Sequence, residues 1–321
     1  LESLIMTDFF SGSKPDLISL KTINDLAVLA GGEDSPATKI MKPLTKKTDI
    51  KSIYTNYIKP NLVPIILIVA FLLFLLVRYM TLKEQFERNG YLGPLEVMSR
   101  AEAHALRDIA LDTEKNINLM NSDYRCKSNV LFPWVDGVSR HPKLLEYLTE
   151  LIGPNIHCWD TLFWIKKPGD GKDVSFHQDA TYWNFNNKHL AVTAWFAFDD
   201  VTEEHGSLEY VQGSHRVFQR RHKDVKTDTN LLMRGQTVDE DVPKERIRTT
   251  VPAGHVLLHS PYIIHGSGPN LADTPRVAMG MIFASTECKP ILELSPESTV
   301  MVSGVDAYNY MQHDPRPTGI W

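Results

Sequence analysis

The chain has 321 residues, of which 43% are hydrophobic and 23% are charged, the balance of an ordinary globular protein rather than of a disordered or fibrous one. Its formal net charge of -5 argues against nucleic acid as a partner. The three cysteines, Cys126, Cys158 and Cys288, are widely separated and lack zinc-type spacing. A disulfide framework is therefore disfavoured, although one disulfide with a free thiol remains open.

The first 60 residues mix polar, charged and short apolar stretches, and we expect residues 1–60 to lie mostly outside any core. The chain does not begin with Met, so Met6 or Met41 could be the natural start. Residues 62–77, LVPIILIVAFLLFLLV, then carry no charged or hydrogen-bonding side chain. With Arg78 reaching the interface and apolar residues following it, the run is long enough for a bilayer span of about 17 to 25 residues.

We therefore predict a single hydrophobic helix over residues 61–82 that crosses a membrane, with a buried core helix as the alternative reading. A cleaved signal peptide fits only if Met41 is the start. More lysines precede the run than basic residues follow it, which would leave the N-terminal side cytosolic. The unpaired cysteines and the missing Asn-x-Ser/Thr acceptor favour the opposite orientation. The sequence thus predicts a single-pass membrane protein and leaves the side of its catalytic domain undecided.

Residues 83–321 are expected to form one domain that begins with helices. An amphipathic pattern starts near Ser99, a good N-cap with Glu102 three residues later as its capping-box partner. The segment HPKLLEYLTELIG predicts a second helix that ends at Gly153.

Short runs rich in aromatic and β-branched residues follow, such as LAVTAWFAFDDV and RVAMGMIFAS, separated by turns such as PGDG, VPAGH and GSGPN. This pattern is typical of an antiparallel sheet with many strands. It predicts a mainly β fold, a double-sheet jelly roll of the cupin-like kind, with flanking helices.

The segment SFHQDATYW places His177 and Asp179 two residues apart at the end of a predicted strand, where both side chains project from one face. Two histidines and one carboxylate on one side of an ion are the ligands of Fe(II) oxygenases, whereas zinc prefers a closed tetrahedral set. A second His-x-Asp pair, His222 and Asp224, lies in a charged stretch without a strand pattern. We expect that second pair to be a solvated loop.

The third ligand has to come from a distant strand, and HVLLHSPYIIHGSGPN offers His255, His259 and His265. His265 is preferred because it ends an apolar run and opens a glycine-rich turn, so that its ring can face a barrel mouth. His259 remains as an alternative ligand or as a hydrogen-bonded strand residue, and His255 is expected to be exposed.

Arg276 opens the next predicted strand. Its planar guanidinium suits the distal carboxylate of 2-oxoglutarate, although an arginine at the start of a strand could equally lie on the surface.

Taken with NGYLGP near the start of the domain, FHQDATYW, VTAWFAFDDVTEEHGSLEYVQGSHR and HGSGPN followed by RVAMG, the sequence resembles the phytanoyl-CoA dioxygenase family from about Phe86 to Ser285. The resemblance implies a double-stranded β-helix, Fe(II), 2-oxoglutarate and dioxygen as co-substrates, and release of succinate and carbon dioxide. It also implies that Trp195 and Ser267 contact 2-oxoglutarate beside Arg276. Trp159 is aligned more loosely with a position that lines the same pocket. Gln178 should point away from the metal.

The function implied is that of an Fe(II)- and 2-oxoglutarate-dependent dioxygenase, an enzyme that hydroxylates an organic, small-molecule or lipid-like substrate. Related halogenases lack the carboxylate ligand, and the presence of Asp179 argues against that activity. A catalytically silent jelly-roll binding or scaffold protein is the alternative. The intact set of His177, Asp179, His265 and Arg276 disfavours it, and the sequence does not identify the substrate.

Overall fold

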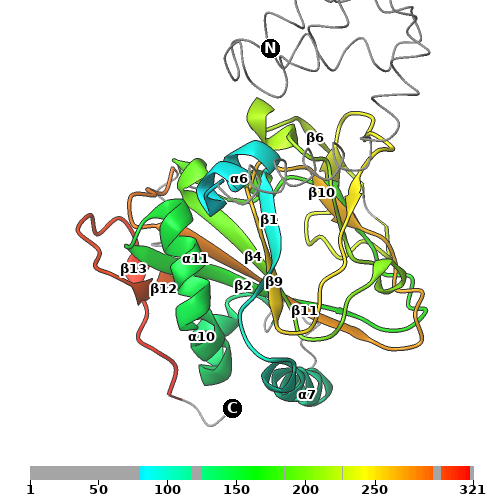
Figure 1. Cartoon of the computed structure of the whole chain (residues 1–321), viewed down its shortest axis with the longest axis horizontal. Coiled ribbons are helices and arrows are strands. Elements are labelled where there is room, and N and C mark those ends of the chain that lie inside the picture. The colour runs from blue at the N-terminus through cyan, green and yellow to red at the C-terminus, as the bar shows by residue number, and fades with distance from the viewer. Residues whose placement is uncertain (1–79, 118–124, 184–185, 226, 292–297, 319–321) are drawn as a thin grey trace, which may run out of the picture. The chain divides into compact units, whose positions relative to one another are not determined.

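The computed structural model describes residues 80–117, 125–183, 186–225, 227–291 and 298–318 (Figure 1). They belong to a compact unit, Met80–Trp321. The predicted N-terminal segment, residues 1–60, and residues 61–79 of the predicted membrane helix lie outside the described residues. Among the helices in the described ranges, none combines the length and the hydrophobicity that a bilayer crossing requires.

Most of the described α-helices precede the strands. They are α6 (Leu82–Asn89), α7 (Arg100–Ile117), α9 (Ser128–Leu131), α10 (Pro133–Ser139) and α11 (Pro142–Ile152). The predicted capping box of α7 is confirmed, because the Ser99 hydroxyl and backbone N–H both donate to Glu102 Oε2, at 2.7 and 2.9 Å. Gly153 ends α11 as predicted, with its N–H donating to the Thr149 carbonyl. Thr81 and Glu84 form a further capping box, so α6 begins at Leu82, the last residue of the predicted membrane helix.

The strands of the described residues form a seven-stranded sheet, a four-stranded sheet and a two-stranded ribbon. The large sheet has the order β1-β9-β4-β11-β2-β12-β13, and the smaller has the order β3-β10-β5-β8. Their bounds are β1 (Tyr91–Glu96), β2 (Ile156–Lys166), β3 (Val174–His177), β4 (Ala191–Ala197), β5 (Leu208–Tyr210), β8 (Ile247–Arg248), β9 (His255–His259), β10 (His265–Ser267), β11 (Arg276–Ser285), β12 (Ser298–Ser303) and β13 (Gln312–His313). The ribbon pairs β6 (His222–Asp224) with β7 (Gln236–Val238).

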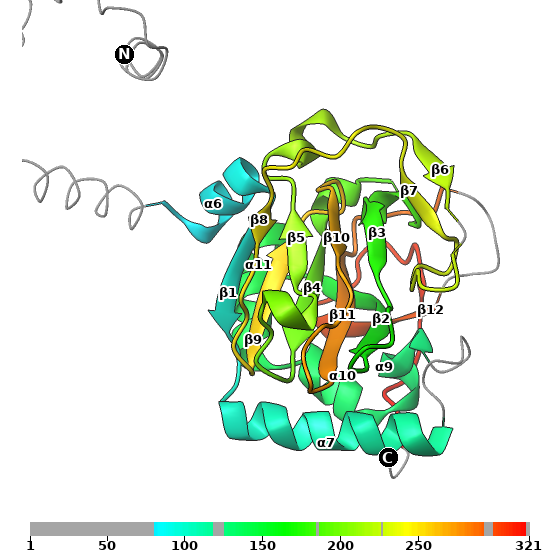
Figure 2. The same cartoon turned by 90° about the vertical axis from the view of Figure 1, so that its right-hand side faces the viewer.

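The smaller sheet faces the large one, and α7 runs across one end of both, as Figure 2 shows. The opposite face of the large sheet carries α10 and α11 (Figure 1). Leu144 and Leu148 of α11 are fully buried there in one cluster with Phe163, Phe196 and Phe283 of the sheet. The fold is therefore a jelly-roll-like double-stranded β-helix of mixed α/β composition, with a larger helical share than the predicted mainly β class.

Alternation along two central strands, β11 and β4, decides which side chains reach the space between the sheets. On β11, Val277 and Met279 face the helices, whereas Arg276 and Gly280 line the cavity between the sheets. On β4, Phe196 faces the helices and Trp195 the cavity. Successive side chains of a strand point to opposite faces, so one row of each strand builds the core and the other row builds the site.

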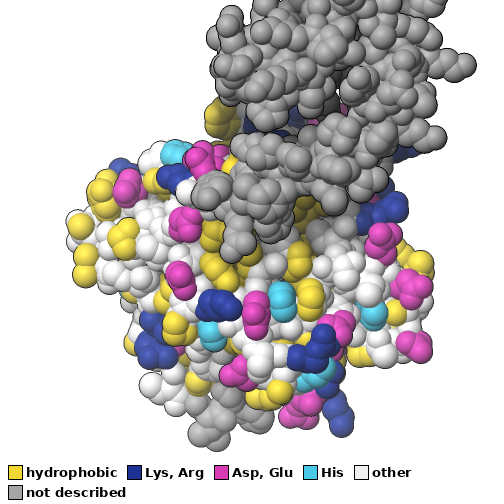
Figure 3. All heavy atoms as spheres, in the orientation of Figure 1, with side chains coloured by type: hydrophobic (Ala, Val, Ile, Leu, Met, Phe, Trp, Pro, Cys, Tyr) yellow, Lys and Arg dark blue, Asp and Glu magenta, His cyan; other side chains and the backbone are white. Residues whose placement is uncertain are grey.

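Two details differ from the sequence-based expectations or complete them. The stretch around His222 is not a loop, because His222–Asp224 form β6 and pair with Gln236–Val238. All three cysteines lie in described ranges and none forms a disulfide, which resolves the alternative left open by the sequence. On the face shown in Figure 3, acidic and basic side chains of the described residues are interspersed with hydrophobic ones, as expected for a chain whose charges nearly balance.

Candidate active site

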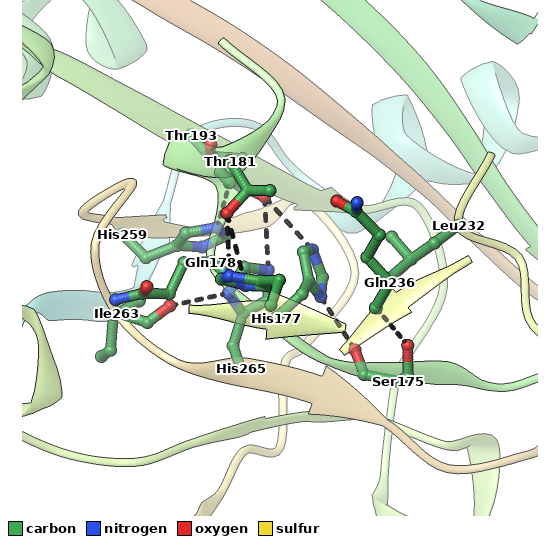
Figure 4. Close-up of polar contacts among 12 residues, drawn as sticks. Ser175, His177, Gln178, Thr181, Thr193, Leu232, Gln236, His259, Ile263 and His265 are labelled. Carbon is green, nitrogen blue, oxygen red and sulfur yellow. Dashed lines mark hydrogen bonds and ion pairs between the residues drawn. The ribbon is translucent and has the colours of Figure 1, made fainter. Parts of the chain in front are cut away.

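Three residues predicted as metal ligands meet at the junction of β3 and β10. His177 ends β3, Asp179 opens the short 3-10 helix η3 (Asp179–Thr181), and His265 begins β10. The two histidines are direct partners in the register of the antiparallel pair. One ligand atom from each of the three side chains lies within 4.8 Å of the others, and Figure 4 shows the two imidazoles side by side.

The orientation of both imidazoles is fixed by the backbone two residues earlier. Nδ1 of His177 lies 2.9 Å from the Ser175 carbonyl, and Nδ1 of His265 lies 3.1 Å from the Ile263 carbonyl (Figure 4). A carbonyl can only accept, so each Nδ1 carries the proton and each Nε2 keeps its lone pair. Burial, and after it the neighbouring His177, lower the pKa of His265 well below its usual value. His265 is therefore prepared as a neutral metal ligand, and the same kind of Nδ1 contact turns Nε2 of His177 toward the candidate metal position.

The two carboxylate oxygens of Asp179 have different partners. Oδ1 lies 3.3 Å from His177 Nε2 and 3.7 Å from His265 Nε2, on the side where a metal ion would bind. Oδ2 accepts hydrogen bonds from Thr193 Oγ1 at 2.6 Å and from His259 Nε2 at 3.2 Å. Burial alone would raise the pKa of Asp179, but the surrounding histidines hold that pKa well below its usual range. The aspartate is thus an anion with one oxygen available for a metal.

His259, the alternative ligand candidate, lies behind Asp179 rather than in the convergent group. It is buried at the end of β9, and its Nδ1 lies 2.9 Å from the hydroxyl of Tyr210. Since Nε2 donates to Asp179, Nδ1 accepts the Tyr210 proton. The expectation that His259 is a hydrogen-bonded strand residue is confirmed. His255, the third candidate, is only partly exposed at the start of β9, which corrects the expectation of an exposed turn residue.

Gln178 points away from the ligand group, as predicted. Its amide nitrogen donates to the carbonyls of Phe218 and Tyr262, at 2.8 and 2.6 Å. Its backbone N–H donates to Nε2 of His222 at 3.1 Å. The second His-x-Asp pair is therefore not a second site; its histidine is partly buried and supports the first motif from behind.

The predicted 2-oxoglutarate residues lie along one wall of the same cavity, on β4, β10 and β11. Trp195, Ser267 and Arg276 all line it together with the three candidate metal ligands. Arg276 is fully buried, its guanidinium carbon lies 5.5 Å from the centre of the Trp195 ring, and burial lowers its pKa to about 9. Its Nη1 donates to the carbonyl of Gly206, but among the described residues none accepts a hydrogen bond from its Nε.

Gly206 is required for this arrangement. Its φ of +65° is unfavourable for residues with a side chain, and a Cβ there would collide with the carbonyl of Gly268.

A second buried basic side chain, Lys166, lies opposite Arg276 and was not predicted from the sequence. The two residues are direct partners in the register of β2 and β11. Lys166 Nζ donates to Ser267 Oγ at 2.7 Å and to the carbonyls of Ser267 and Gly268, the former at 3.3 Å. Burial, and after it the charge of Arg276, lower the pKa of Lys166 to about 6. Detecting it from sequence would have required the register between strands more than a hundred residues apart.

The buried charge of Arg276 forms no ion pair within the described part of the chain, whereas the lowered pKa of Lys166 leaves that amine largely uncharged at neutral pH. Buried charges are ordinarily paired, because removing them from water is costly. The unpartnered Nε of Arg276 and the Ser267 hydroxyl therefore fit an anionic group supplied by a ligand, as the distal carboxylate of 2-oxoglutarate would provide.

Trp159 is not among the residues that line this cavity. It lines an adjacent cavity of about 250 Å³ that shares His177 and Asp179 with the first. Its ring packs edge-on against Trp183, with 6.1 Å between ring centres. The β2 residue that lies near Arg276 is instead Trp164. Its carbonyl oxygen lies 3.5 Å from Arg276 Nη2.

Comparison with known proteins agrees with this geometry. Residues 86–278, more than half of the chain, match the family model for phytanoyl-CoA dioxygenase (PhyH). The chain is 26% identical over 228 residues to the peroxisomal phytanoyl-CoA dioxygenase of Homo sapiens, covering 63% of this chain and 67% of that protein. It is also 26% identical over 218 residues to a probable alpha-ketoglutarate-dependent hypophosphite dioxygenase of Stutzerimonas stutzeri, covering 66% and 74%.

A solved structure with a similar fold is that of the non-heme monooxygenase ThoJ. It superimposes with a TM-score of 0.66 at 24% identity, covering 74% of this chain and 88% of that one. This likeness supports the double-stranded β-helix independently of the sequence motifs. The match to the family model, with an HxD and a distant histidine brought together in the fold, leads to one conclusion: the chain belongs to the phytanoyl-CoA dioxygenase family and is an Fe(II)- and 2-oxoglutarate-dependent dioxygenase.

Proposed function

We propose that His177, Asp179 and His265 hold the iron and that the enzyme hydroxylates a C–H bond of a small organic or lipid-like substrate. The observation that carries the proposal is the convergence of two Nε2 lone pairs and one carboxylate oxygen on a single point. A facial set of this kind leaves coordination positions open for a co-substrate and for dioxygen. When bound, Fe(II) with 2-oxoglutarate supplies the oxidising chemistry, coupled to loss of carbon dioxide.

The chain's own residues bind and orient the reactants. Arg276 offers its free Nε–H to the distal carboxylate of 2-oxoglutarate, and the Ser267 hydroxyl donates beside it while accepting from Lys166. Trp195 forms the wall against which the co-substrate lies. These donors sit on strands rather than on loops, so the position of the co-substrate is set before it binds.

Thr193 and His259 restrain Asp179 so that one oxygen faces the metal. Both donate to Oδ2, which leaves Oδ1 as the oxygen available for coordination. A carboxylate that binds through one oxygen occupies one position instead of two, and the remaining positions stay open. The presence of Asp179 as a carboxylate ligand also argues against halogenation. The assembly of the candidate ligands with Arg276 argues against a catalytically silent binding or scaffold protein.

The proposal is tested with purified protein loaded anaerobically with Fe(II). Addition of 2-oxoglutarate and oxygen should produce succinate even without the natural substrate. His177→Ala, Asp179→Ala and His265→Ala should each eliminate that activity and iron binding, whereas His255→Ala should preserve both. Succinate formation that persists in all three ligand variants would contradict the ligand assignment. Comparing metabolites of cells with and without the gene, for products heavier by one oxygen atom, would identify the substrate.

We further propose that residues 62–82 anchor the enzyme in a membrane as a single-pass protein, with the side of the catalytic domain left undecided. The support is the uncharged run of residues 62–77, in which central Leu, Ile, Phe and Val each favour insertion by about 0.3 to 0.6 kcal/mol. The family motifs begin after this run, so no candidate ligand depends on it.

A further inference from the structure

A second cavity adjoins the candidate metal ligands, and its lining does not include the predicted co-substrate residues Trp195, Ser267 and Arg276. It encloses about 250 Å³ and shares His177 and Asp179 with the first cavity. Its walls are mainly apolar and aromatic, with contributions from Trp159, Trp183 and Leu232. A cavity of this composition with a few polar groups is the usual form of a small-molecule site. Its position against His177 and Asp179 would place a bound molecule beside the iron.

Arg125 is the buried cation of this cavity. Only 6% of its surface is exposed, and its guanidinium carbon stacks 4.4 Å from the centre of the Trp164 ring. Nε donates to the carbonyl of Phe163 at 3.2 Å, and Nη1 donates to that of Leu231 at 2.7 Å. Nη2 has no hydrogen-bond partner among the described residues, and no carboxylate there pairs with the guanidinium. A buried charge held in this way lacks its counter-ion.

A second arginine reinforces the positive character of the cavity. The guanidinium carbon of Arg234 lies 5.3 Å from the centre of the Tyr182 ring, and its Nη1 contacts the Thr181 carbonyl at 3.4 Å. Of the two acidic lining residues, Asp179 belongs to the candidate metal ligands, and Asp160 has an oxygen that accepts the backbone N–H groups of Lys127 and Thr161, both at 2.7 Å. Its charge is therefore directed toward the backbone, and the cavity offers cationic donors to a ligand.

We propose that the substrate of this dioxygenase is an apolar molecule bearing a carboxylate, and that Arg125 selects it. The apolar body packs among Trp159, Trp164 and Trp183, and the carboxylate pairs with the guanidinium of Arg125, which lines the cavity. Arg234 adds a second favourable charge. This inference rests on the proposed function, since it concerns the molecule that is oxidised beside the same iron.

The site distinguishes a carboxylate from a neutral molecule because the guanidinium of Arg125 lacks a counter-ion among the described residues. A neutral molecule of the same shape would bury Arg125 without a counter-ion, whereas a carboxylate forms a charge-assisted hydrogen bond with it. Sites built to bond a polar group reject analogues that lack it more strongly than apolar pockets reject a change in size. Lysine would not replace Arg125, because only the planar guanidinium can stack on Trp164 and also donate in three directions.

The test uses 4-phenylbutanoate and its neutral counterpart, 4-phenylbutanamide, as probes. Each is titrated by calorimetry into anaerobic protein loaded with Fe(II) and saturating 2-oxoglutarate, so that the anion site at Arg276 is already filled. The carboxylate should bind at least roughly tenfold more tightly than the amide, as expected for one hydrogen bond to a charged group. Arg125→Gln should remove that preference while leaving amide binding unchanged, and Arg234→Gln should reduce it several-fold.

Arg221→Gln is the matched control, because the Arg221 side chain is 88% exposed and does not line the cavity. Circular dichroism checks that each variant is folded. If Arg125→Gln is unfolded, the ratio of carboxylate to amide affinity in Arg125→Lys and in Arg234→Gln provides the test instead. Equal affinity for acid and amide, no binding of the acid, or a preference that survives both Arg125 and Arg234 substitution would overturn the inference. The affinity for 2-oxoglutarate, measured in the same samples, separates this failure from failure of the proposed function, which would abolish co-substrate binding as well.

Discussion

The imidazole of His259 donates a hydrogen bond to Asp179, with 3.2 Å between Nε2 and Oδ2, and the opposite ring nitrogen contacts Tyr210. The carboxylate of this candidate metal ligand is therefore held by a chain of buried groups that reaches from β9 to β5. Outer groups of this kind orient a ligand, and donors to a carboxylate keep it ionised.

Replacing His259 by Ala should weaken Fe(II) binding by roughly 10- to 100-fold without eliminating it, the usual effect of losing an outer partner of a metal ligand. The sequence left His259 open as an alternative ligand or a hydrogen-bonded strand residue, and its hydrogen bond to Asp179 gives the reason for the expected effect. Anaerobic titration with Fe(II) measures the effect, with His255→Ala as the control. Complete loss of binding would instead make His259 a ligand, and unchanged affinity would make its hydrogen bond irrelevant to the metal.

Arg276→Lys should raise the dissociation constant for 2-oxoglutarate by roughly tenfold or more while sparing iron. Lysine supplies a point charge and cannot reproduce the planar fork of donors, and a hydrogen bond to a charged group contributes about 1.5 to 3 kcal/mol. Calorimetric titration of 2-oxoglutarate into Fe(II)-loaded protein provides the measurement. Arg248→Lys, at a side chain that is 52% exposed, is the control. An unaltered co-substrate affinity in Arg276→Lys would return Arg276 to a structural role.

Lys166 should make 2-oxoglutarate binding depend on pH. Burial and then Arg276 lower its pKa to about 6, against the opposing charges of Asp173 and Asp170. A bound dianion favours the ammonium form, so the pKa of Lys166 is higher in the complex than in the free protein. Above pH 6 the complex therefore keeps a Lys166 proton that the free protein has lost. The affinity for 2-oxoglutarate should fall as the pH rises from about 6 toward the pKa of Lys166 in the complex.

Calorimetry in buffers of different ionisation enthalpy would detect that proton uptake. Lys166→Met should bind 2-oxoglutarate more weakly near pH 6 and lose the Lys166-dependent decline. If the mutant and the natural protein showed parallel pH profiles, Lys166 would not be coupled to the co-substrate. Iron affinity, measured alongside, serves as the internal control.

A truncated protein that starts at Met80 should be recovered without detergent and should retain succinate formation. It keeps Thr81, whose side chain and that of Glu84 cap α6, and every described strand. The full-length chain should remain in the membrane pellet after carbonate extraction. Its release into the supernatant would contradict the anchor, and failure of the truncated protein to fold would instead make residues 62–79 part of the catalytic core.

Local patterns were enough to single out the candidate metal ligands that the fold brings together. His177 and Asp179 lie within three residues of each other, and His265 is marked by the change from an apolar run to a glycine-rich turn. Arg276 and Ser267 followed from motifs of similar length. The helix limits at Ser99 and Gly153 were also local, since capping depends on neighbours three or four residues away.

The features that were missed depend on pairing between distant segments. Lys166 lies beside the site because it pairs with Arg276 in the register of β2 and β11. Trp159 stands earlier on β2 than Trp164 and lines the adjacent cavity. The charged β6 strand formed although its composition favoured a loop, because its partner β7 supplies the hydrogen bonds. Tertiary context overrides such local preferences.

The alternation along β11 makes this strand intolerant of changes in length. Arg276 and Gly280 face the cavity, and Val277 and Met279 face the helices. Deleting a single residue after Arg276 would turn the rest of the strand by one face, as any one-residue slip does in a sheet. Methionine and valine side chains would then line the cavity beside the candidate metal ligands. The residues that now line that cavity would instead face the hydrophobic core. Insertions and deletions in natural variants of this enzyme should therefore fall in the turns, where the phase of the strand is not disturbed.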